Sequence, residues 1–285
     1  MDEVESKIVE LVKKKRELHN LGDEVIAKEV RKILGANKKV SEKISSLKSS
    51  QLSKSADVKD IIKQVRSKAR LSYGMFKTKK STALSKLILE LKEILKDHDI
   101  RSPESLAMHK KILDTHRSTK ERGDVYASLY EHLFELSMQP KIVLDLGCGI
   151  NPISWVFMPK QKLTIHAREW SEEDIEELSQ YYDISGLEGT VKSADLTKEK
   201  KFPKSDVCFL WKVVDVIEHE KRGSARQILE SLDTRWIIVS FATETIGGRR
   251  MNSERRWFKN MLKAMGREYD QYSISNEMFF IIKNK

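Results

Sequence analysis

A glycine-containing run in the second half of the chain has the residue types that best suit ligand binding. An apolar stretch beginning at Val143 leads through Asp145 into Gly147, Cys148 and Gly149. Glycines after a strand let the backbone approach a ligand closely, and open α/β sheets bind ligands at the carboxyl ends of their strands. The run continues with Asn-Pro where the dinucleotide pattern G-x-G-x-x-G requires other residues, so phosphate binding is the weaker interpretation.

Two carboxylates follow at the ends of the next two expected strands. Glu169 ends the run KLTIHARE, about 20 residues beyond the glycines, where a carboxylate can accept both ribose hydroxyls of an adenosyl group. The alternative is a surface glutamate at a strand end. Asp195 ends the weaker run TVKSAD and is placed to receive an adenine amino group. Cys148 has no histidine or aspartate pattern beside it that supports a nucleophile, so we expect it to fill space.

The elements around these residues indicate an α/β fold. From residue 140, short apolar runs (KIVLDLG, KLTIHA, SDVCFLW, TRWIIVSF) alternate with helical segments, which predicts a mostly parallel sheet with crossover helices. The runs REYDQYSI and EMFFIIK lie close together across Ser275–Asn276 and predict a terminal antiparallel hairpin. We therefore expect a Rossmann-like domain over residues 111–285, with its ligand site at the glycine turn.

Residues 1–110 are expected to form a separate, all-α basic domain. Apolar residues recur at helical spacing over residues 4–12, 25–34 and 58–65. Gly35 is expected to end the second of these helices. The Ser/Lys-rich stretch 45–55 is expected to be a mobile connection. The apolar stripe over residues 84–95 is interpreted as core.

The excess positive charge lies entirely in this first part. Residues 1–110 hold 26 Lys+Arg and 16 Asp+Glu, whereas the remainder holds 27 of each. Clustered cations neutralise phosphates and release counterions, so a polyanion is the natural partner. Lys77, Lys79 and Lys80 follow Tyr73 and Phe76, a pattern that suits exposed RNA bases. The alternatives are a solvated lysine-rich helix face and a helix end with two core aromatics.

Several stretches, in the same order, resemble one family, the aminoglycoside-resistance (Arm/Rmt, or FmrO-type) 16S rRNA guanine-N7 methyltransferases. They cover most of residues 110–285, and the N-terminal hundred residues match only in being helical and basic. The expected layout is that of class I S-adenosylmethionine-dependent methyltransferases. The matching stretches are HRSTKER, LDLGCGINP, LWKVVDVIEHEKRGSARQILESLDT, SFATETIGGR and NEMFFIIKNK.

The resemblance implies S-adenosylmethionine as cofactor and N7 of a guanine in the decoding-site helix of small-subunit rRNA as target. It implies that Arg122 binds the methionine carboxylate and that Glu169, where the family usually has Asp, takes the ribose. Lys212 is implied to face the methyl-transfer site, and Arg249 and Arg250 to hold the RNA backbone. The implied cofactor-binding residues are Arg122, Asp145, Gly147, Cys148, Gly149, Asn151, Glu169, Asp195 and Leu196.

Methylation of guanine N7 needs no general base, because N7 carries an exposed lone pair and no proton. This agrees with the lack of any acid–base constellation in the sequence. The base must leave its helix to react and is expected to stack on an aromatic ring, for which Trp155, Trp211 and Trp257 are candidates. A tRNA or other rRNA methyltransferase is an alternative, and so is a non-catalytic ribosome-assembly protein that binds RNA.

Other classes of protein are disfavoured by composition. The two cysteines and seven histidines have no metal-site spacing, and no apolar run is long enough to span a membrane. The first ten residues are acidic and lack the apolar segment of a secretory signal. We expect a monomeric cytoplasmic protein that uses S-adenosylmethionine, binds no metal and has the small ribosomal subunit as partner.

Reversing the charge of Lys77, Lys79 and Lys80 to glutamate is predicted to weaken RNA binding roughly tenfold and to lower the slope of log affinity against log salt by about 3, since each phosphate contact contributes about one. The measurement is a salt titration of binding to small subunits. The same reversal at Lys200, Lys201 and Lys204, in the charge-balanced part, is the control. An unchanged slope in the first variant would refute the RNA contact.

Overall fold

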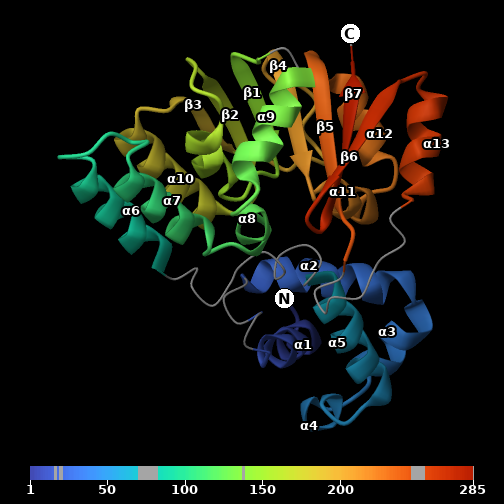
Figure 1. Ribbon diagram of the computed structural model, residues 1–285. Coiled ribbons are helices and arrows are strands. Elements are labelled where there is room, and N and C mark those ends of the chain that lie inside the picture. Colours follow the sequence, from blue (N-terminus) through green and yellow to red (C-terminus); the bar gives the residue numbers. More distant parts are fainter. Residues whose placement is uncertain (16–17, 19–21, 70–82, 137–138, 245–253, 285) are drawn as a thin grey trace. The chain divides into compact units, whose positions relative to one another are not determined.

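The computed structural model describes residues 1–15, 18, 22–69, 83–136, 139–244 and 254–284 (Figure 1). The chain divides into two compact units, Met1–Phe76 and Lys77–Lys285. The first is helical, and the second is a sheet covered by helices on both faces. The all-α part and the α/β part predicted from the sequence are both present.

The first unit is built from five helices among its described residues. Apolar residues on their inner faces, including Ile8, Val12, Val30 and Val65, form one buried cluster. Asp2 caps the first helix by accepting a hydrogen bond from the Glu5 amide, which satisfies an otherwise free N–H group. The helices are α1 (Glu3–Lys13), α2 (Asp23–Ala36), α3 (Lys38–Ser45), α4 (Ser49–Leu52) and α5 (Ala56–Ala69).

Two local expectations for this unit are wrong. Gly35 does not end α2, which continues to Ala36 and is followed by Asn37, whose side chain accepts from the Val40 amide and begins α3. The Ser/Lys-rich stretch is not a connection without structure, because it holds the end of α3 and all of α4. Leu52 of this stretch is 1% exposed in the core, so a few apolar residues in a polar background were enough to order it.

The second unit contains a seven-stranded sheet in the order β3-β2-β1-β4-β5-β7-β6. Strands β1 to β5 pair in parallel, and β7 pairs antiparallel with both β5 and β6. This confirms the parallel sheet and the terminal hairpin. The strands are β1 (Ile142–Leu146), β2 (Thr164–Glu169), β3 (Glu188–Ser193), β4 (Ser205–Trp211), β5 (Thr234–Ala242), β6 (Tyr269–Ile274) and β7 (Glu277–Lys283).

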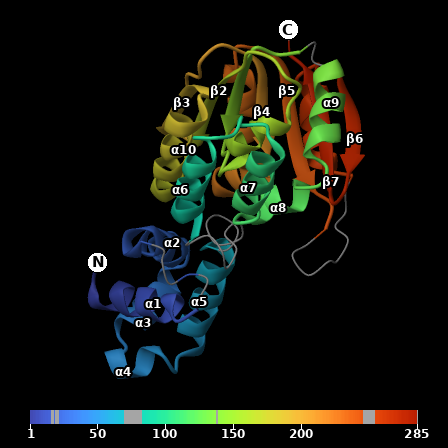
Figure 2. The ribbon, with the colours of Figure 1, turned by 60° about the vertical axis from the view of Figure 1, so that its left-hand side comes forward.

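Alternate residues of the strands enter two separate cores on the two faces of the sheet. Phe209 packs toward α9 and α10, whereas Leu210 packs toward α11, α12 and α13. Figure 2 shows the side of the sheet over which α7, α8 and α9 lie. The helices are α6 (Leu84–Ile94), α7 (Pro103–Leu113), α8 (Arg117–Arg122), α9 (Tyr126–Leu136), α10 (Glu172–Ser185), α11 (Val214–Glu220), α12 (Ser224–Ser231) and α13 (Arg256–Ala264).

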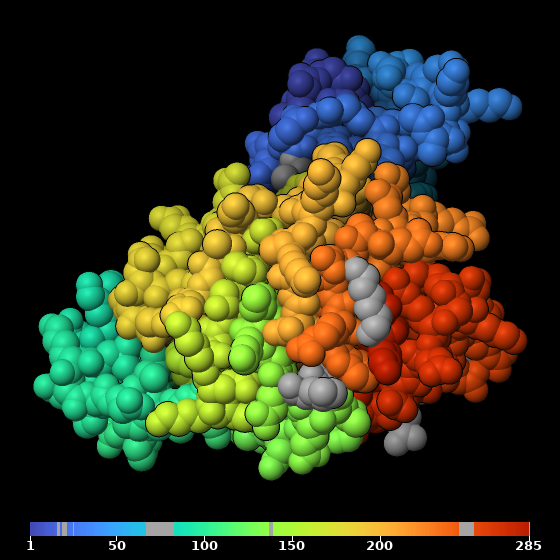
Figure 3. Space-filling view, turned by 90° about the horizontal axis from the view of Figure 1, so that it is seen from above, coloured from blue at the N-terminus to red at the C-terminus, as the bar shows by residue number. Residues whose placement is uncertain are grey.

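The charge distribution predicted a boundary between the two parts at residue 110. The structure instead divides the chain between Phe76 and Lys77. Helices α6 and α7 belong to the sheet unit because Leu84, Ile88, Leu91 and Ile112 are buried in its core. The space-filling view shows this segment in direct contact with its neighbours in the sheet unit (Figure 3). Burial of apolar side chains, not the position of the lysines, determines which unit a helix joins.

Replacing Leu91 by alanine is predicted to destabilise the sheet unit by about 2–5 kcal/mol, because a fully buried leucine leaves a cavity in the core. The measurement is urea unfolding followed by tryptophan fluorescence. Leu89→Ala on the same helix, where the side chain is 58% exposed, is the matched control and is expected to change stability by less than about 0.5 kcal/mol. Equal effects of the two substitutions would show that α6 is not part of this core.

Candidate active site

The candidate site lies at the carboxyl edge of the sheet, where the strand order reverses between β1 and β4. Open α/β sheets bind ligands at such a reversal, because neighbouring connections leave the sheet in opposite directions there and open a crevice. Strand β1 leads into the turn Gly147–Gly149, and β4 leads into Lys212. The sequence-predicted glycine turn and Lys212 therefore face the reversal from its two sides.

The glycine turn requires its glycines. Gly147 and Gly149 have φ of +64° and +51°, in the left-handed region that other residues avoid. The amides of Gly147 and Cys148 both donate to the Arg168 carbonyl, at 2.8 and 3.2 Å. A Cβ atom on Gly147 would lie 2.5 Å from Cγ2 of Val213. The turn from β1 is thus packed directly against the residue that follows Lys212.

Glu169 is the last residue of β2, and its side chain joins the end of this strand to the glycine turn. One carboxylate oxygen accepts from the Gly149 amide at 2.7 Å, and the other accepts from the amides of Trp170 and Ser171 at 2.7 and 3.1 Å. Burial raises the pKa of Glu169, against the lowering effect of these amides. The carboxylate is held in one position beside the glycine turn.

Asp145 and Asn151 form the inner wall of the site. Asp145 is 2% exposed and accepts from the Asn151 amide nitrogen at 2.8 Å. The oxygen of the same Asn151 side chain accepts from the Tyr126 hydroxyl at 2.9 Å and from Arg122 at 3.2 Å. Burial raises the pKa of Asp145 to about 7, although the hydrogen bond from Asn151 and the charge of Arg122 lower it.

Arg122 lies in the site but already has a carboxylate partner. Its Nε and Nη2 atoms donate to the two carboxylate oxygens of Glu277 at 2.9 and 3.1 Å, and both side chains are almost fully buried. The Arg122 guanidinium also lies 4.7 Å from the centre of the Trp211 ring. Glu277 thus occupies one side of the Arg122 guanidinium. Only the remaining N–H groups of Arg122 can bind the methionine carboxylate that the resemblance predicts.

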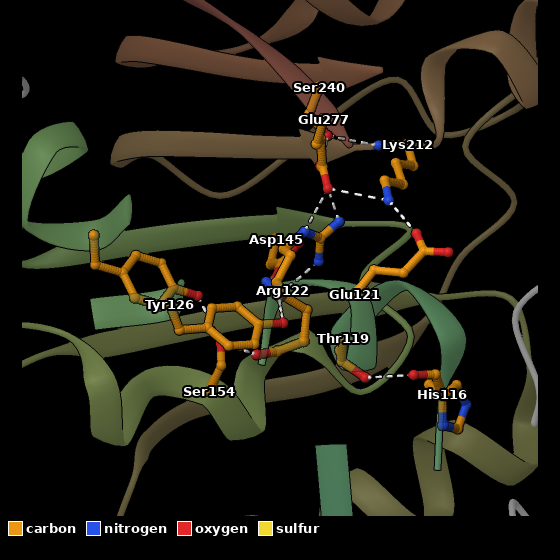
Figure 4. Close-up of polar contacts among 12 residues, drawn as sticks. His116, Thr119, Glu121, Arg122, Tyr126, Asp145, Ser154, Lys212, Ser240 and Glu277 are labelled. Atoms are coloured by element: carbon orange, nitrogen blue, oxygen red, sulfur yellow. Dashed lines mark hydrogen bonds and ion pairs between the residues drawn. The ribbon is translucent and has the colours of Figure 1, made fainter. Parts of the chain in front are cut away.

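Glu277 is the residue that sequence reasoning missed. Besides the two bonds from Arg122, it accepts a short hydrogen bond from the Ser240 hydroxyl and pairs with Lys212 at 3.1 Å (Figure 4). Burial raises the pKa of Glu277, but the charges of Arg122 and Lys212 bring it below the usual value. A glutamate starting the apolar run EMFFIIK could have been noticed as a charge entering the core, since buried charges need partners.

Lys212 has a restrained geometry that suits a functional residue. It is a non-glycine residue with φ of +57°, and its amide lies within hydrogen-bond distance of the carbonyl and the hydroxyl of Ser240, at 3.1 and 3.0 Å. Its ammonium donates to Glu121 at 2.7 Å. Strained backbone of this kind concentrates at functional sites. The structure therefore places Lys212 in one network with Arg122.

Asp195 and Leu196, which were predicted to bind the cofactor, take no part in the hydrogen bonds recorded for this network among the described residues. Strand β3 ends at Ser193, two residues earlier than expected, and Asp195 lies directly before a turn that begins at Leu196. Its carboxylate accepts from the Thr197 amide and hydroxyl at 3.1 and 2.6 Å and pairs with Lys198 at 2.7 Å. Leu196 is 8% exposed in the second core.

Cys148 is buried, and burial raises the pKa of its thiol well above the usual value. This agrees with space filling and not with a nucleophile. His116 is buried as well, and its Nε2 lies 3.2 Å from the Asp174 carboxylate. It therefore has a structural position, because 2% exposure leaves no surface for RNA. Among the described residues, no cluster of side chains could hold a metal ion.

The three candidate aromatic platforms differ in exposure. Trp211 is buried and stacked on Phe209 at 4.6 Å between ring centres. Trp155 is half-buried and donates its indole N–H to the Tyr181 hydroxyl. Trp257 on α13 is 37% exposed, which makes it the most accessible of the three. The predicted RNA contacts Lys77, Lys79, Lys80, Arg249 and Arg250 lie outside the described residues.

The sheet order and the glycine turn at its reversal define a class I S-adenosylmethionine-dependent methyltransferase fold. Solved structures agree in overall fold. The 16S rRNA methyltransferase RmtF in complex with S-adenosyl-L-homocysteine superposes with a TM-score of 0.72 at 20% identity, over 100% of both chains. The 16S rRNA methylase RmtB has a TM-score of 0.68 at 21% identity, over 99% of this chain and 98% of its own.

Within that class, residues 38–282 match the model of the ribosomal RNA methyltransferase (FmrO) family, and the chain belongs to this family. A Proteus mirabilis protein named 16S rRNA (guanine(1405)-N(7))-methyltransferase is 27% identical over 239 residues, which cover 79% of this chain and 84% of that protein. A Micromonospora echinospora protein of the same name is 23% identical, over 80% of this chain and 84% of that protein.

The buried Asp145 predicts a dependence of stability on pH. Its folded-state pKa of about 7 lies above the usual value near 4 in an unfolded chain. Between these values the folded state keeps a proton that the unfolded state has lost, so this group's contribution to stability is present below about pH 4 and is lost as pH rises through about 7.

Relative to Asp145→Asn, the unfolding free energy of the wild type is therefore expected to fall by roughly 2–5 kcal/mol between pH 4 and pH 8. The measurement is urea unfolding of both proteins across this range, and the comparison cancels groups that the two share. Parallel curves would show that Asp145 titrates normally. Asn retains an acceptor for the Asn151 side chain, so the change is confined to the charge.

Proposed function

We propose that this protein transfers a methyl group from S-adenosylmethionine to N7 of a guanine in 16S rRNA, in the decoding-site helix of the small ribosomal subunit. The observation that carries this proposal is the family match over residues 38–282, with relatives named for this reaction along most of both chains. The proposed setting is the cytoplasm, with the protein acting as a monomer. No helix within the described ranges is long and apolar enough to cross a membrane.

The residues around the glycine turn fit the proposed cofactor. Glu169 is fixed beside Gly149, where its carboxylate can accept the ribose hydroxyls. Asp195 and Leu196 follow the neighbouring strand and would flank the adenine. The N–H groups of Arg122 that Glu277 leaves would take the methionine carboxylate. The turn itself, with Asp145, Gly147, Cys148, Gly149 and Asn151, would lie against the methionine part.

The proposed reaction is a direct displacement. When bound, the cofactor supplies a methyl group activated by a sulfonium. The protein's own residues contribute by fixing the two reactants in line and excluding water, which can supply several kcal/mol of the barrier. Lys212 stands where β4 meets the strand reversal and is proposed to face the target base. The base must be turned out of its helix to reach this position, and Trp257 is the accessible ring for stacking.

Residues of each unit are proposed to contact the RNA. Residues 1–76 hold 18 Lys+Arg against 11 Asp+Glu, so the helical unit is suited to phosphates. Lys77, Lys79 and Lys80 continue this basic character, and Arg249 and Arg250 are proposed to hold the RNA backbone near the target. A non-catalytic role in ribosome assembly is less well supported, because hydrogen bonds join Glu169 to Gly149 and Asp145 to Asn151 at the carboxyl edge of the sheet, where a cofactor could bind.

The proposal is tested by incubating intact small subunits, naked 16S rRNA and tRNA with the protein and S-adenosylmethionine. N7-methylguanine is then mapped by reductive cleavage of the RNA chain. We expect a single modified guanine in 16S rRNA. Modification found only on tRNA would remove the ribosomal function, and failure to bind the cofactor in calorimetric titration would support the non-catalytic alternative.

Glu169→Ala is expected to weaken binding of S-adenosylhomocysteine roughly 10- to 100-fold in the same titration, because hydrogen bonds to a charged acceptor contribute about 1.5–3 kcal/mol. Glu172→Ala is the matched control, since this glutamate is exposed on the first turn of α10. Thermal melting of each variant separates loss of binding from loss of folding. Equal affinity of a folded Glu169→Ala protein would remove the proposed ribose contact.

A further inference from the structure

The ammonium of Lys212 has three N–H donors, and carboxylates account for two of them. One N–H donates to Glu121 at 2.7 Å, and the nitrogen also forms an ion pair with Glu277 at 3.1 Å. Across the part of the chain that the structure describes, no third acceptor is recorded for this group. The side chain is nevertheless only 8% exposed. At least one N–H donor of Lys212 is therefore without an acceptor among the residues that the structure describes.

The two carboxylates are themselves held in place, so that the ammonium has little freedom. Glu277 is fixed by Arg122 and Ser240. Glu121 accepts from Arg117 at 2.8 Å through its other oxygen. Burial raises the pKa of Glu121, but the hydrogen bond and charge of Lys212 bring it below the usual value, so it remains ionised. The third N–H of Lys212 is preorganised rather than mobile.

The position of Lys212 places its ammonium close to the proposed site of the methyl donor. The residue that follows it, Val213, lies against the glycine turn so closely that a Cβ on Gly147 would clash with it. Lys212 also comes immediately after β4, opposite the end of β1 at the strand reversal. A base that brings its N7 to the methyl group at this place would turn the edge that carries N7 toward the Lys212 ammonium.

On guanine, that edge presents O6, an acceptor, next to N7. Adenine presents an amino group at the same place, which is a donor and would meet the ammonium unfavourably. We propose that the third N–H of the Lys212 ammonium donates to O6 of the target guanine, so that this side chain both selects guanine and aligns its N7 with the methyl group. This inference rests on the function proposed above and names the specificity-determining contact of that site.

The charges around Lys212 are compatible with the methyl transfer. The N7 lone pair forms the new bond to carbon, and the S–CH3 bond breaks with its electron pair remaining on sulfur. The positive charge thus moves from sulfur to the base. Lys212 and Arg122 are balanced by Glu121 and Glu277, so the ammonium can bind O6 without a net cation opposing the charge that develops on the ring.

The experiment uses small subunits reconstituted with 16S rRNA that carries either guanine or 2-aminopurine at the mapped target position. 2-Aminopurine keeps N7 and the 2-amino group but has hydrogen in place of O6. Single-turnover methyl transfer is measured with the full-length wild type and with Lys212→Met. The intrinsic N7 reactivity of the two bases is measured separately with dimethyl sulfate, and the enzymatic ratio is divided by it.

The wild type is expected to methylate guanine about 10- to 100-fold faster than 2-aminopurine after this correction, as for one charge-assisted hydrogen bond. Lys212→Met is expected to lose a similar factor on guanine and nothing further on 2-aminopurine. Lys212→Arg keeps a charged donor and should retain a preference for guanine. Lys221→Met, an exposed lysine at the end of α11, is the control and should keep the full wild-type ratio.

A folded Lys212→Met protein that keeps the wild-type ratio would overturn the proposal. If Lys212→Met does not fold, the rates of the wild type alone test the proposal. Equal corrected rates of the wild type on guanine and 2-aminopurine would exclude a contact to O6. Failure of the proposed function has a different result, since the wild type would then leave guanine-containing subunits unmethylated.

Discussion

The buried carboxylate of Glu277 is the group on which the arrangement of the active site depends. It accepts from Arg122 and Ser240 and pairs with Lys212, and it is 1% exposed. Removing such ions from water costs several kcal/mol each, and the cost is offset only when partners are complete and well aligned. Helix α8, strand β4 and strand β7 are therefore tied into one unit, and a shift of any of them would leave a buried charge without its partner.

This network extends from the side of the site proposed for the methyl donor to the side proposed for the target base. Arg122 continues through Asn151 to Asp145, at the base of the glycine turn. Lys212 continues to Glu121 and is proposed to face the target base. One set of contacts thus positions residues proposed for the cofactor and for the base, which suits a reaction whose rate depends on alignment more than on proton transfer.

The antiparallel β7 explains why a residue from the end of the chain can occupy the centre of the site. Parallel strands bring their carboxyl ends to the ligand edge, so each contributes its last residues there. Strand β7 runs the opposite way and contributes its first residue, Glu277, which pairs in register with Ala242 at the end of β5. The hairpin therefore brings a carboxylate into the site that a purely parallel sheet would have placed at the far edge.

The class of fold, the glycine turn, the place of Glu169 at the end of its strand and the basic helical part could all be predicted from the sequence. Local periodicity and glycine positions depend only on neighbours along the chain. The sequence did not reveal that α6 and α7 belong to the sheet unit, or that Arg122 is already paired with Glu277. Both depend on contacts between segments far apart in sequence. Which face of a helix is covered, and which charge meets which, is decided only when tertiary packing excludes water between them.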